Sequence, residues 1–473
     1  MRKETSPKKR THYESWRARS FEALATRFME FCSSYHDLFN VARRNVSGKA
    51  RCYVAGLLHK APAKNMERME DYVEDFDYQS QQQFLSDSPW DHRKLMDRVG
   101  RDVSDVIGGA NSSLVLDETA FAKQGRKSVG VARQWNGRLG KVDNCQVGVF
   151  AALTNGQRSG LVDFRLYLPA EWAEDAQRCG AAKIPADQIR FRKKSELASE
   201  MVDSALANGL DFGWVLADGG YGKEPDFLSA LDNRGLRFIV DVHRDQGVYM
   251  KDPRPYLPRR KNGLGRKYTR YRAREKSVEL EALFDSISSK AWRNYTLRDT
   301  TRGAIKVTAC SRRVWLWDGR TKNAREWTAV CVKFAATGET KWFVSNAPAS
   351  TSLHVLLQRH SDRYWVERTF QDAKSSVGMA DYQARGWVAW HHHMAMVALA
   401  LLFMLRERVV HNREIEMLSC NDLIELLTVY LPRKDVRPEE VIRNIERRHR
   451  KRLAAIAARS RAPNTASPLI SVL

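Results

Sequence analysis

SDRYWVERTFQDAK, residues 361–374, is the segment from which the organisation of this chain is most readily inferred. As a helix, it would place Arg363, Glu367 and Lys374 on one face, because offsets of four and seven residues return to the same side of a helix with 3.6 residues per turn. A carboxylate between two cations suits a divalent metal ion held against a phosphate group. Such a site needs two further carboxylates.

Two candidate carboxylates lie upstream, each after a short apolar run. Residues 112–120, SSLVLDETA, contain Asp117, and residues 212–222, FGWVLADGGYG, contain Asp218. Both runs predict buried strands with an acid at the carboxyl end. Ligands of open α/β sheets bind outside the carboxyl ends of strands, so we expect the two acids to meet there. The glycines after Asp218 predict a tight turn that a backbone or a nucleic acid can approach closely.

Asp117, Asp218 and Glu367 together resemble the catalytic triad of DDE transposases from cut-and-paste bacterial insertion sequences. The spacing Arg-x3-Glu-x6-Lys is similar to the branch with a Tyr-Arg-Glu-Lys signature, although His360 stands at the Tyr position. In that branch the Tyr contacts DNA near the cleaved end, and the resemblance implies that His360 makes the corresponding DNA contact. The phrases GRKSVGVARQW and GRLGKVDNCQV extend the likeness over residues 111–390.

The resemblance implies two-metal-ion phosphoryl transfer on double-stranded DNA. Asp117 would bridge both ions, with Asp218 and Glu367 taking one each. Oxygen ligands favour Mg²⁺, with Mn²⁺ as a substitute. One ion would activate a water or a DNA 3′-hydroxyl and the other would stabilise the leaving oxygen. The implied enzyme cleaves mobile-element ends and joins the 3′-hydroxyls to target DNA, acting as a homodimer on paired ends.

Two other functions remain open. One is a metal-dependent DNA nuclease of the same fold, which cuts without strand transfer. The other is a domesticated DNA-binding protein that has lost catalysis, although the three intact acids count against it.

The composition also favours a nucleic-acid partner. The 473 residues include 79 Lys plus Arg against 56 Asp plus Glu, a net charge of +23, which attracts a polyanion. A 43% hydrophobic content is typical of a globular protein. Four cations follow Asp117 closely and are predicted to contact DNA, as are Arg363 and Lys374; a generic basic hairpin is the alternative. The four are Lys123, Arg126, Lys127 and Arg133.

The order of apolar runs predicts an α/β fold. Three strands in succession and then strands alternating with helices imply an antiparallel portion extended by parallel strands. This order is similar to the ribonuclease H-like catalytic core of the DDE family. The expected divisions are a helical N-terminal DNA-binding domain (1–105), the core (106–242 and 351–405), a β-strand insertion domain (243–350) and a basic helical C-terminal region (406–473). For the first and last regions, a packed bundle and a solvated charged helix are the alternatives.

The insertion carries two further predictions. Its basic start, residues 252–274, is expected to follow a phosphate backbone, with a solvated linker as the alternative. One of its tryptophans would stack on an exposed base, although packing explains most tryptophans in strands. The candidates are Trp292, Trp315, Trp317, Trp327 and Trp342.

Cysteine usage and hydropathy favour a cytoplasmic, nucleoid-associated bacterial protein. The seven cysteines show neither a zinc spacing nor a disulfide framework. The longest apolar run, residues 394–405, is too short to span a bilayer, so no membrane partner is expected. The adjacent His391, His392 and His393 point to different sides of a helix and cannot converge on one metal ion.

Overall fold

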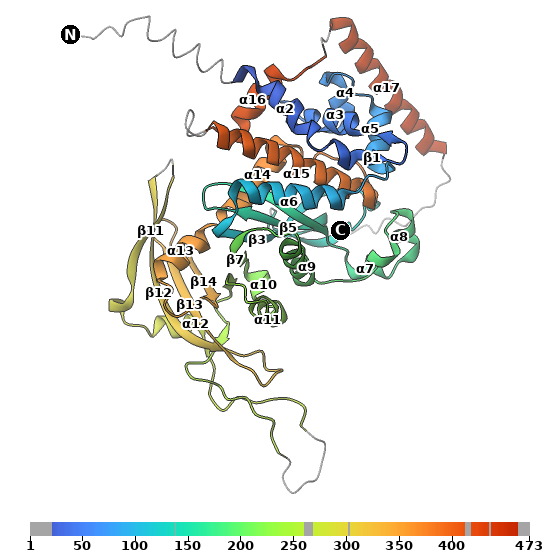
Figure 1. The fold of residues 1–473 in the computed structure, drawn as a ribbon. Helices are drawn as coiled ribbons and strands as arrows, with labels where there is room; N and C mark the ends of the chain where they lie inside the picture. Colours follow the sequence, from blue (N-terminus) through green and yellow to red (C-terminus); the bar gives the residue numbers. More distant parts are fainter. Residues whose placement is uncertain are drawn as a thin grey trace, which may run out of the picture.

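The computed structural model describes residues 21–137, 139–259, 268–300, 303–411, 418–434 and 437–461. Helices from both ends of the chain gather on one side of a large sheet, and a strand-rich region extends the sheet away from them (Figure 1). The predicted α/β class is confirmed.

Within the described residues, ten strands form one mixed sheet. Six of them come from the part of the chain before residue 243: β3 (Gly109–Ala122), β4 (Ala132–Asn136), β5 (Lys141–Thr154), β6 (Ser159–Leu166), β7 (Phe212–Ala217) and β8 (Phe238–Val242). The central order is β6-β5-β3-β7-β8. Strand β5 pairs on one edge with two strands in turn, with β4 along residues 141–145 and with β6 along residues 148–154. Strand β5 is antiparallel to β6 and β3, whereas β3, β7 and β8 are mutually parallel.

Helices cover both faces of this sheet, which explains why its inner strands are apolar without alternation. Residues 112–116 of β3 and 145–154 of β5 are buried throughout. One face carries α6 (His92–Ile107), α14 (Tyr364–Ser376) and α15 (Trp387–Val410), and the other carries α9 (Lys194–Ala207), with α11 (Pro225–Asn233) packed beside α9.

Helix α15 is the central core helix. It is longer than the apolar run in the sequence suggested, and it is the one helix in the described residues that is long and apolar enough to cross a membrane. However, 94% of its most apolar window is buried inside the protein, so its hydropathy is explained by core packing. His391, His392 and His393 bond separately to Trp387 O, to Leu85 O and Trp90 O, and to the Tyr53 hydroxyl.

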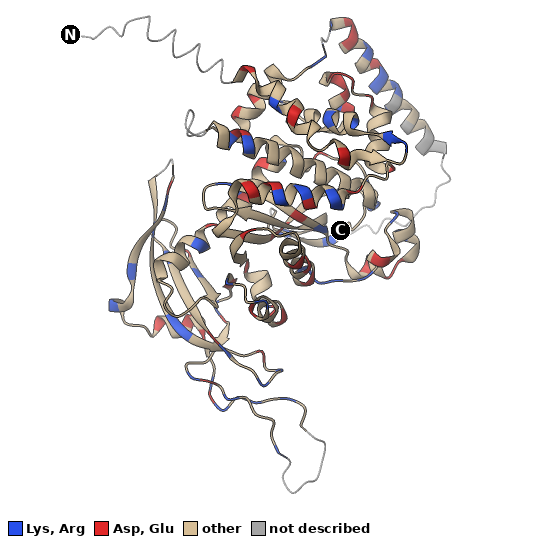
Figure 2. Cartoon of the chain, in the orientation of Figure 1, with Lys and Arg blue, Asp and Glu red and all other residues tan. Residues whose placement is uncertain are grey.

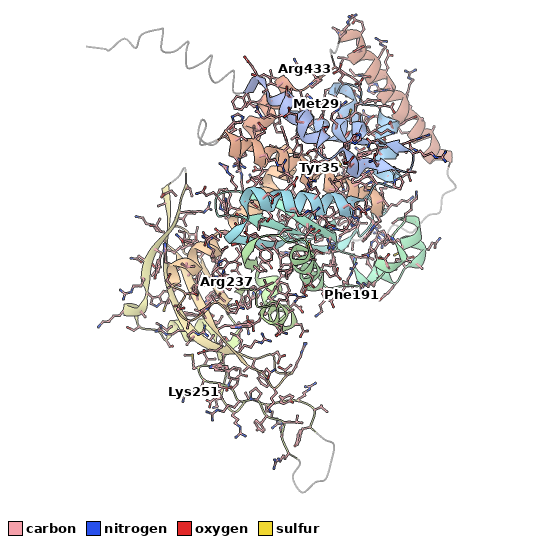
Figure 3. All side chains as sticks on the ribbon, viewed as in Figure 1. Met29, Tyr35, Phe191, Arg237, Lys251 and Arg433 are labelled. Carbon is pink, nitrogen blue, oxygen red and sulfur yellow. The ribbon has the colours of Figure 1, made fainter. Side chains whose placement is uncertain are left out.

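The N-terminal helices and α16 share the hydrophobic core, and α3 and α5 pack directly on α15. The helices of this layer are α2 (Leu24–Ser33), α3 (Ser47–Leu58), α4 (Met66–Tyr72), α5 (Tyr78–Ser86) and α16 (Cys420–Tyr430), and α17 (Pro438–Arg461) is attached outside it through ion pairs with α4. On α2, Arg27 forms an ion pair of 2.7 Å with Glu407 of α15. Tyr35, labelled in Figure 3, is buried and donates its hydroxyl to Asp102 of α6. These contacts tie the helical layer to the sheet.

The region after β8 extends the same sheet. It contains β9 (Gly247–Val248), β10 (Val278–Glu279), α12 (Leu280–Asp285), β11 (Arg293–Thr300), β12 (Gly303–Leu316), β13 (Arg325–Phe334) and β14 (Thr340–Ser345). Strands β11 to β14 are successively antiparallel, and β14 pairs antiparallel with β8, so core and insertion are continuous. The short helix α12 was not expected from the sequence, which indicated strands alone.

Replacing Phe150 with Ala should destabilise the protein strongly. Phe150 is fully buried, and its ring centroid lies 5.4 Å from that of Phe370 on α14 and 6.2 Å from that of Phe164 on β6. We expect a loss of about 3–5 kcal/mol in the free energy of unfolding, measured by chemical denaturation. The matched control, Trp135→Ala, removes a side chain that is 56% exposed and should cost about 0.5 kcal/mol or less. Similar losses in the two variants would contradict this account of the core.

Candidate active site

Asp117 and Asp218 follow paired positions of two parallel neighbours. The β3–β7 ladder ends at Leu116 opposite Ala217, so the two acids are the next residues of their chains. Asp218 directly follows the end of β7, as the sequence predicted. Asp117 does not end its strand, which is a correction: β3 continues to Ala122, because β5 still pairs with it there.

The turn after Asp218 is tight for a structural reason. The Asp218 carboxylate accepts hydrogen bonds from the backbone N–H groups of Gly220 and Tyr221, at 2.9 and 3.3 Å. A Cβ at Gly222 would lie 2.0 Å from the carbonyl oxygen of Asp241, so only glycine fits there. The close neighbour is therefore the backbone of β8.

Glu367 lies on a helix that starts later than the sequence suggested. Residues 361–374 are not one helix: α13 (Leu353–Ser361) ends first, and α14 begins at Tyr364 with Arg363 as its N-cap residue. Asp362 at this break is buried and accepts hydrogen bonds from Ser113 and Arg359. These bonds fix the junction of the two helices against β3.

The charges of the three acids act on one another. Burial raises the pKa of Asp117 to about 7; Arg363 opposes this rise, whereas Asp218 and Glu367 add to it. Burial also lowers the pKa of Arg363, but four carboxylates more than offset the effect and raise it overall. They are Asp241, Asp117, Asp218 and Glu367. One guanidinium therefore interacts electrostatically with all three predicted acids, whereas its ion pair among the described residues is with Asp241.

Asp241 on β8 is the anchor of that guanidinium, and the sequence analysis did not identify it. It forms an ion pair with Arg363 and accepts a hydrogen bond of 2.7 Å from Nε2 of His360. Burial alone would raise the pKa of Asp241, but His360, Arg363 and Lys341 lower it below its usual value. The available signal was RFIVDVH, a third apolar run that reaches an acid near its carboxyl end.

His360 is built into this cluster. Its side chain is 7% exposed, and its ring stacks on Phe343 of β14, with centroids 4.4 Å apart and planes 14° apart. In this arrangement it supports Asp241 and does not face solvent.

Lys374 connects the far end of α14 to β3. Its ammonium donates to Thr119 Oγ1 at 2.7 Å and to Ala120 O at 3.1 Å. Arg363, Glu367 and Lys374 thus share the face of the helix that the spacing indicated, with Lys374 held beside the strand that bears Asp117. Glu118, the next residue on that strand, pairs instead with Lys194 of α9, on the opposite side of the sheet.

The carboxylates offer oxygen ligands but do not form a finished metal site. Among the described residues, no three His, Cys, Asp or Glu side chains are arranged to hold a metal ion. Glu367 is exposed, and its side chain makes no hydrogen bond or ion pair with the described residues. This side chain is therefore able to rotate.

The predicted cations after Asp117 lie in a loop and its flanks. The ammonium of Lys123 lies 3.6 Å from the ring centroid of Tyr382, and burial lowers its pKa to about 8. Arg126 and Lys127 are exposed in the loop before β4, and Arg133 is exposed on β4. The loop spans residues 123–131.

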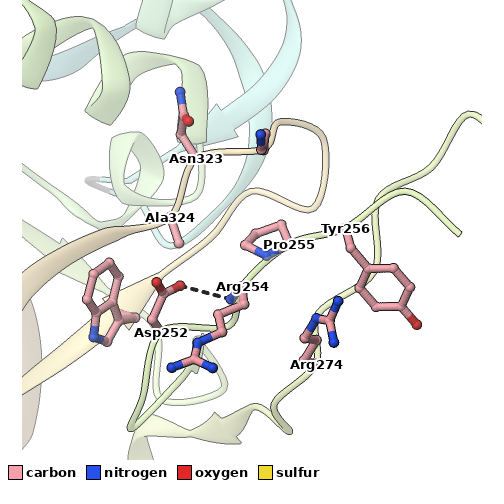
Figure 4. A pocket seen from close by; sticks show the side chains of 9 residues that line it. Asp252, Arg254, Pro255, Tyr256, Arg274, Asn323 and Ala324 are labelled. Carbon is pink, nitrogen blue, oxygen red and sulfur yellow. Dashed lines mark hydrogen bonds between the residues drawn. The ribbon is translucent and has the colours of Figure 1, made fainter.

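A cavity of about 520 Å³ lies in the insertion, and Figure 4 shows its lining. Arg254, Arg274, Lys322 and Trp315 contribute to its wall, and Asp252 accepts the backbone N–H of Arg254 at 2.8 Å. Part of the predicted basic segment, residues 260–267, lies outside the described residues. Trp327, another of the five tryptophans, is buried against Phe238 and packs in the core.

Comparison with known proteins gives two matches. Residues 35–304 match the family described as "DDE superfamily endonuclease", a segment that contains Asp117, Asp218 and Asp241 and ends before α13. The chain is also 24% identical over 359 residues to the "Probable transposase for insertion sequence element IS701" of Microchaete diplosiphon. This alignment covers 75% of the chain and 80% of that protein.

The raised pKa of Asp117 predicts a pH-dependent effect of Asp117→Asn. Between pH 4 and 7 the folded carboxyl group keeps a proton that the unfolded chain releases, so the metal-free protein loses stability as pH rises through this range. Asn cannot ionise and avoids the loss. At pH 8 in a chelator we expect the variant to be more stable than the wild type by roughly 1–3 kcal/mol, and at pH 4 to be nearly equal, in thermal unfolding. A constant difference at both pH values would contradict this assignment.

Replacing Asp241 with Asn should destabilise the protein, because the Arg363 guanidinium loses its ion-pair partner while remaining largely buried. We expect a loss of about 3–5 kcal/mol in the free energy of unfolding. Asp226→Asn is the control, since the Asp226–Arg320 pair of 3.3 Å is exposed and should contribute less than about 1 kcal/mol. Equal losses would mean that Asp241 does not anchor Arg363.

Proposed function

The chain belongs to the DDE superfamily of endonucleases, and we propose on that basis that it is a transposase. The proposed reaction cuts DNA at the ends of a mobile element and joins the freed 3′-hydroxyls to target DNA. The observation that supports the proposal most directly is that Asp117 and Asp218 directly follow the last paired residues of neighbouring parallel strands, while Arg363 interacts electrostatically with both of them and with Glu367. The name of the IS701 relative supports transposition over simple cleavage.

The sheet supports a ribonuclease H-like core as part of this proposal. The order β6-β5-β3-β7-β8, with β5 antiparallel to its neighbours and β3, β7 and β8 parallel, fits the antiparallel portion extended by parallel strands that the order of apolar runs predicted. In this order Asp117 on β3 lies beside Asp218, which follows the parallel neighbour β7. Helix α14 supplies the third acid, Glu367.

Asp117, Asp218 and Glu367 are the residues that would hold two Mg²⁺ ions, or Mn²⁺ in their place. Their donors are all carboxylate oxygens, which hard divalent cations prefer. The high pKa of Asp117 reflects chiefly the burial of its carboxyl group, to which the two neighbouring acids add, and a bound cation would favour the ionised form. Bound ions would supply Lewis-acid activation of the attacking and leaving oxygens.

The remaining residues of the cluster are assigned positioning and DNA contact. Arg363, fixed by Asp241, would offset the repulsion between the acids in the absence of metal and would then face a phosphate oxygen of the bound substrate. Lys374 would contact the phosphate backbone near Asp117. Exposed Arg126, Lys127 and Arg133 would extend this contact along double-stranded DNA, with affinity that falls as salt rises. His360 would act through Asp241.

The transposase proposal can be separated from a nuclease and from a non-catalytic DNA binder in one assay. A labelled duplex carrying the inverted repeats that flank the coding sequence would be incubated with the protein, Mg²⁺ and a supercoiled target plasmid. Joined end–target products would support transposition. Cutting without joining would support a nuclease, and a mobility shift without cutting would support a binder.

Within this assay, Asp117→Ala and Glu367→Ala should abolish cutting, by at least about 10³-fold, while leaving binding of the end duplex intact. Asp143→Ala serves as a control, since Asp143 is an acid of the β4–β5 hairpin that pairs opposite Gln134, away from the cluster. Retained cutting in either Asp117→Ala or Glu367→Ala would remove that residue from the active site.

A further inference from the structure

Helix α17 presents its polar face to the protein. Arg447 pairs with Glu70 at 2.8 Å and Arg448 pairs with Asp71 at 2.6 Å, and both acids lie on α4. These two ion pairs attach the helix along the outer edge of the helical layer, where Figure 1 shows it.

The opposite face of α17 is apolar and exposed. Ile442 is 57% exposed, Ile445 39%, Leu453 65% and Ile456 55%. At 100° per residue, these side chains lie within about 40° of one line along the helix, centred on His449. Helices of globular proteins usually turn such a stripe toward the core. Here the stripe faces outward, which marks it as an interaction surface.

The stripe is symmetric about its midpoint. Ile442 and Ile456 lie seven residues before and after His449, and Ile445 and Leu453 lie four residues before and after it. If a second copy of this helix runs antiparallel, its stripe has the same spacing in the reverse direction. Each Ile442 then meets an Ile456, and each Ile445 meets a Leu453. A self-complementary surface of this kind is what a two-fold symmetric interface requires.

The charges favour the same arrangement. The half of α17 after His449 is strongly basic, with Arg450 and Arg452 exposed, and Glu446 lies just before the midpoint. Antiparallel pairing places Glu446 of each helix beside Arg450 of the other. Parallel pairing would bring the two basic halves together, and like charges at close range destabilise a helix pair.

We propose that the outer face of α17, formed by Ile442, Ile445, His449, Leu453 and Ile456, is a homodimer interface in which two copies of the helix pair antiparallel about a two-fold axis at His449. The use of this dimer to hold two DNA ends rests on the proposed function. The interface itself involves neither the acids nor DNA, so it can be tested separately.

The first test compares assembly states without DNA or metal. The full-length wild type should sediment as a concentration-dependent dimer in analytical ultracentrifugation. Ile445→Glu and Leu453→Glu should each weaken dimerisation by at least about tenfold, because the charge would enter the centre of the apolar stripe. Val429→Glu is the matched control, since Val429 lies on α16 and is 73% exposed outside the stripe. A monomeric wild type, or dimers unaffected by both stripe variants, would overturn the proposal.

The second test establishes the direction of pairing by disulfide trapping. Under mild oxidation, His449→Cys should crosslink to its own copy, because the two-fold axis passes through this position. Ile442→Cys should not crosslink alone but should do so when mixed with Ile456→Cys. The wild type, which has seven free cysteines, sets the background. Efficient self-crosslinking of Ile442→Cys would indicate parallel pairing and overturn the antiparallel assignment.

The two proposals can fail separately. If Asp117→Ala abolishes cutting and α17 variants remain dimeric, the interface is wrong and the function stands. If dimers depend on α17 but no DNA is cut or joined, the function is wrong and the interface stands.

Discussion

The ion pair between Arg363 and Asp241 is the constraint on which the arrangement of the active-site cluster depends. A buried guanidinium needs a carboxylate nearby, and Asp241 provides one from the edge of the parallel strands. With Arg363 fixed, one positive charge acts on the acids of β3, the β7 turn and α14. Their mutual repulsion is thereby tolerated in the absence of metal.

The sheet determines which side chains can meet at this charge. Because β3, β7 and β8 are parallel, Asp117, Asp218 and Asp241 arrive from neighbouring strands running in the same direction. Glu367 comes from much later in the chain, across the whole insertion. The fold thus joins residues that are distant in sequence through strand register and one helix, with glycine at position 222 allowing β8 to come close.

Local patterns in the sequence were sufficient for the elements of the core. The apolar runs predicted β3 and β7, and the helical spacing placed Arg363, Glu367 and Lys374 on one face. Features that depend on distant pairing were not predictable in this way. Strand β3 extends beyond Asp117 because β5 pairs with it, and α13 ends at Ser361 because Asp362 bonds Ser113 on β3. Asp241 was missed because its importance comes from Arg363, which lies 122 residues away.

The seam between β8 and β14 has a mechanical consequence. Asp241 pairs in register with Phe343, Phe343 stacks on His360, and His360 bonds back to Asp241, so three residues form a closed loop across the seam. A force that bends the insertion against the core must strain this loop. Because Asp241 also holds Arg363, such strain would be transmitted to the guanidinium that neutralises the proposed active-site acids. A ligand bound to the distal strands would therefore be coupled mechanically to the proposed active site.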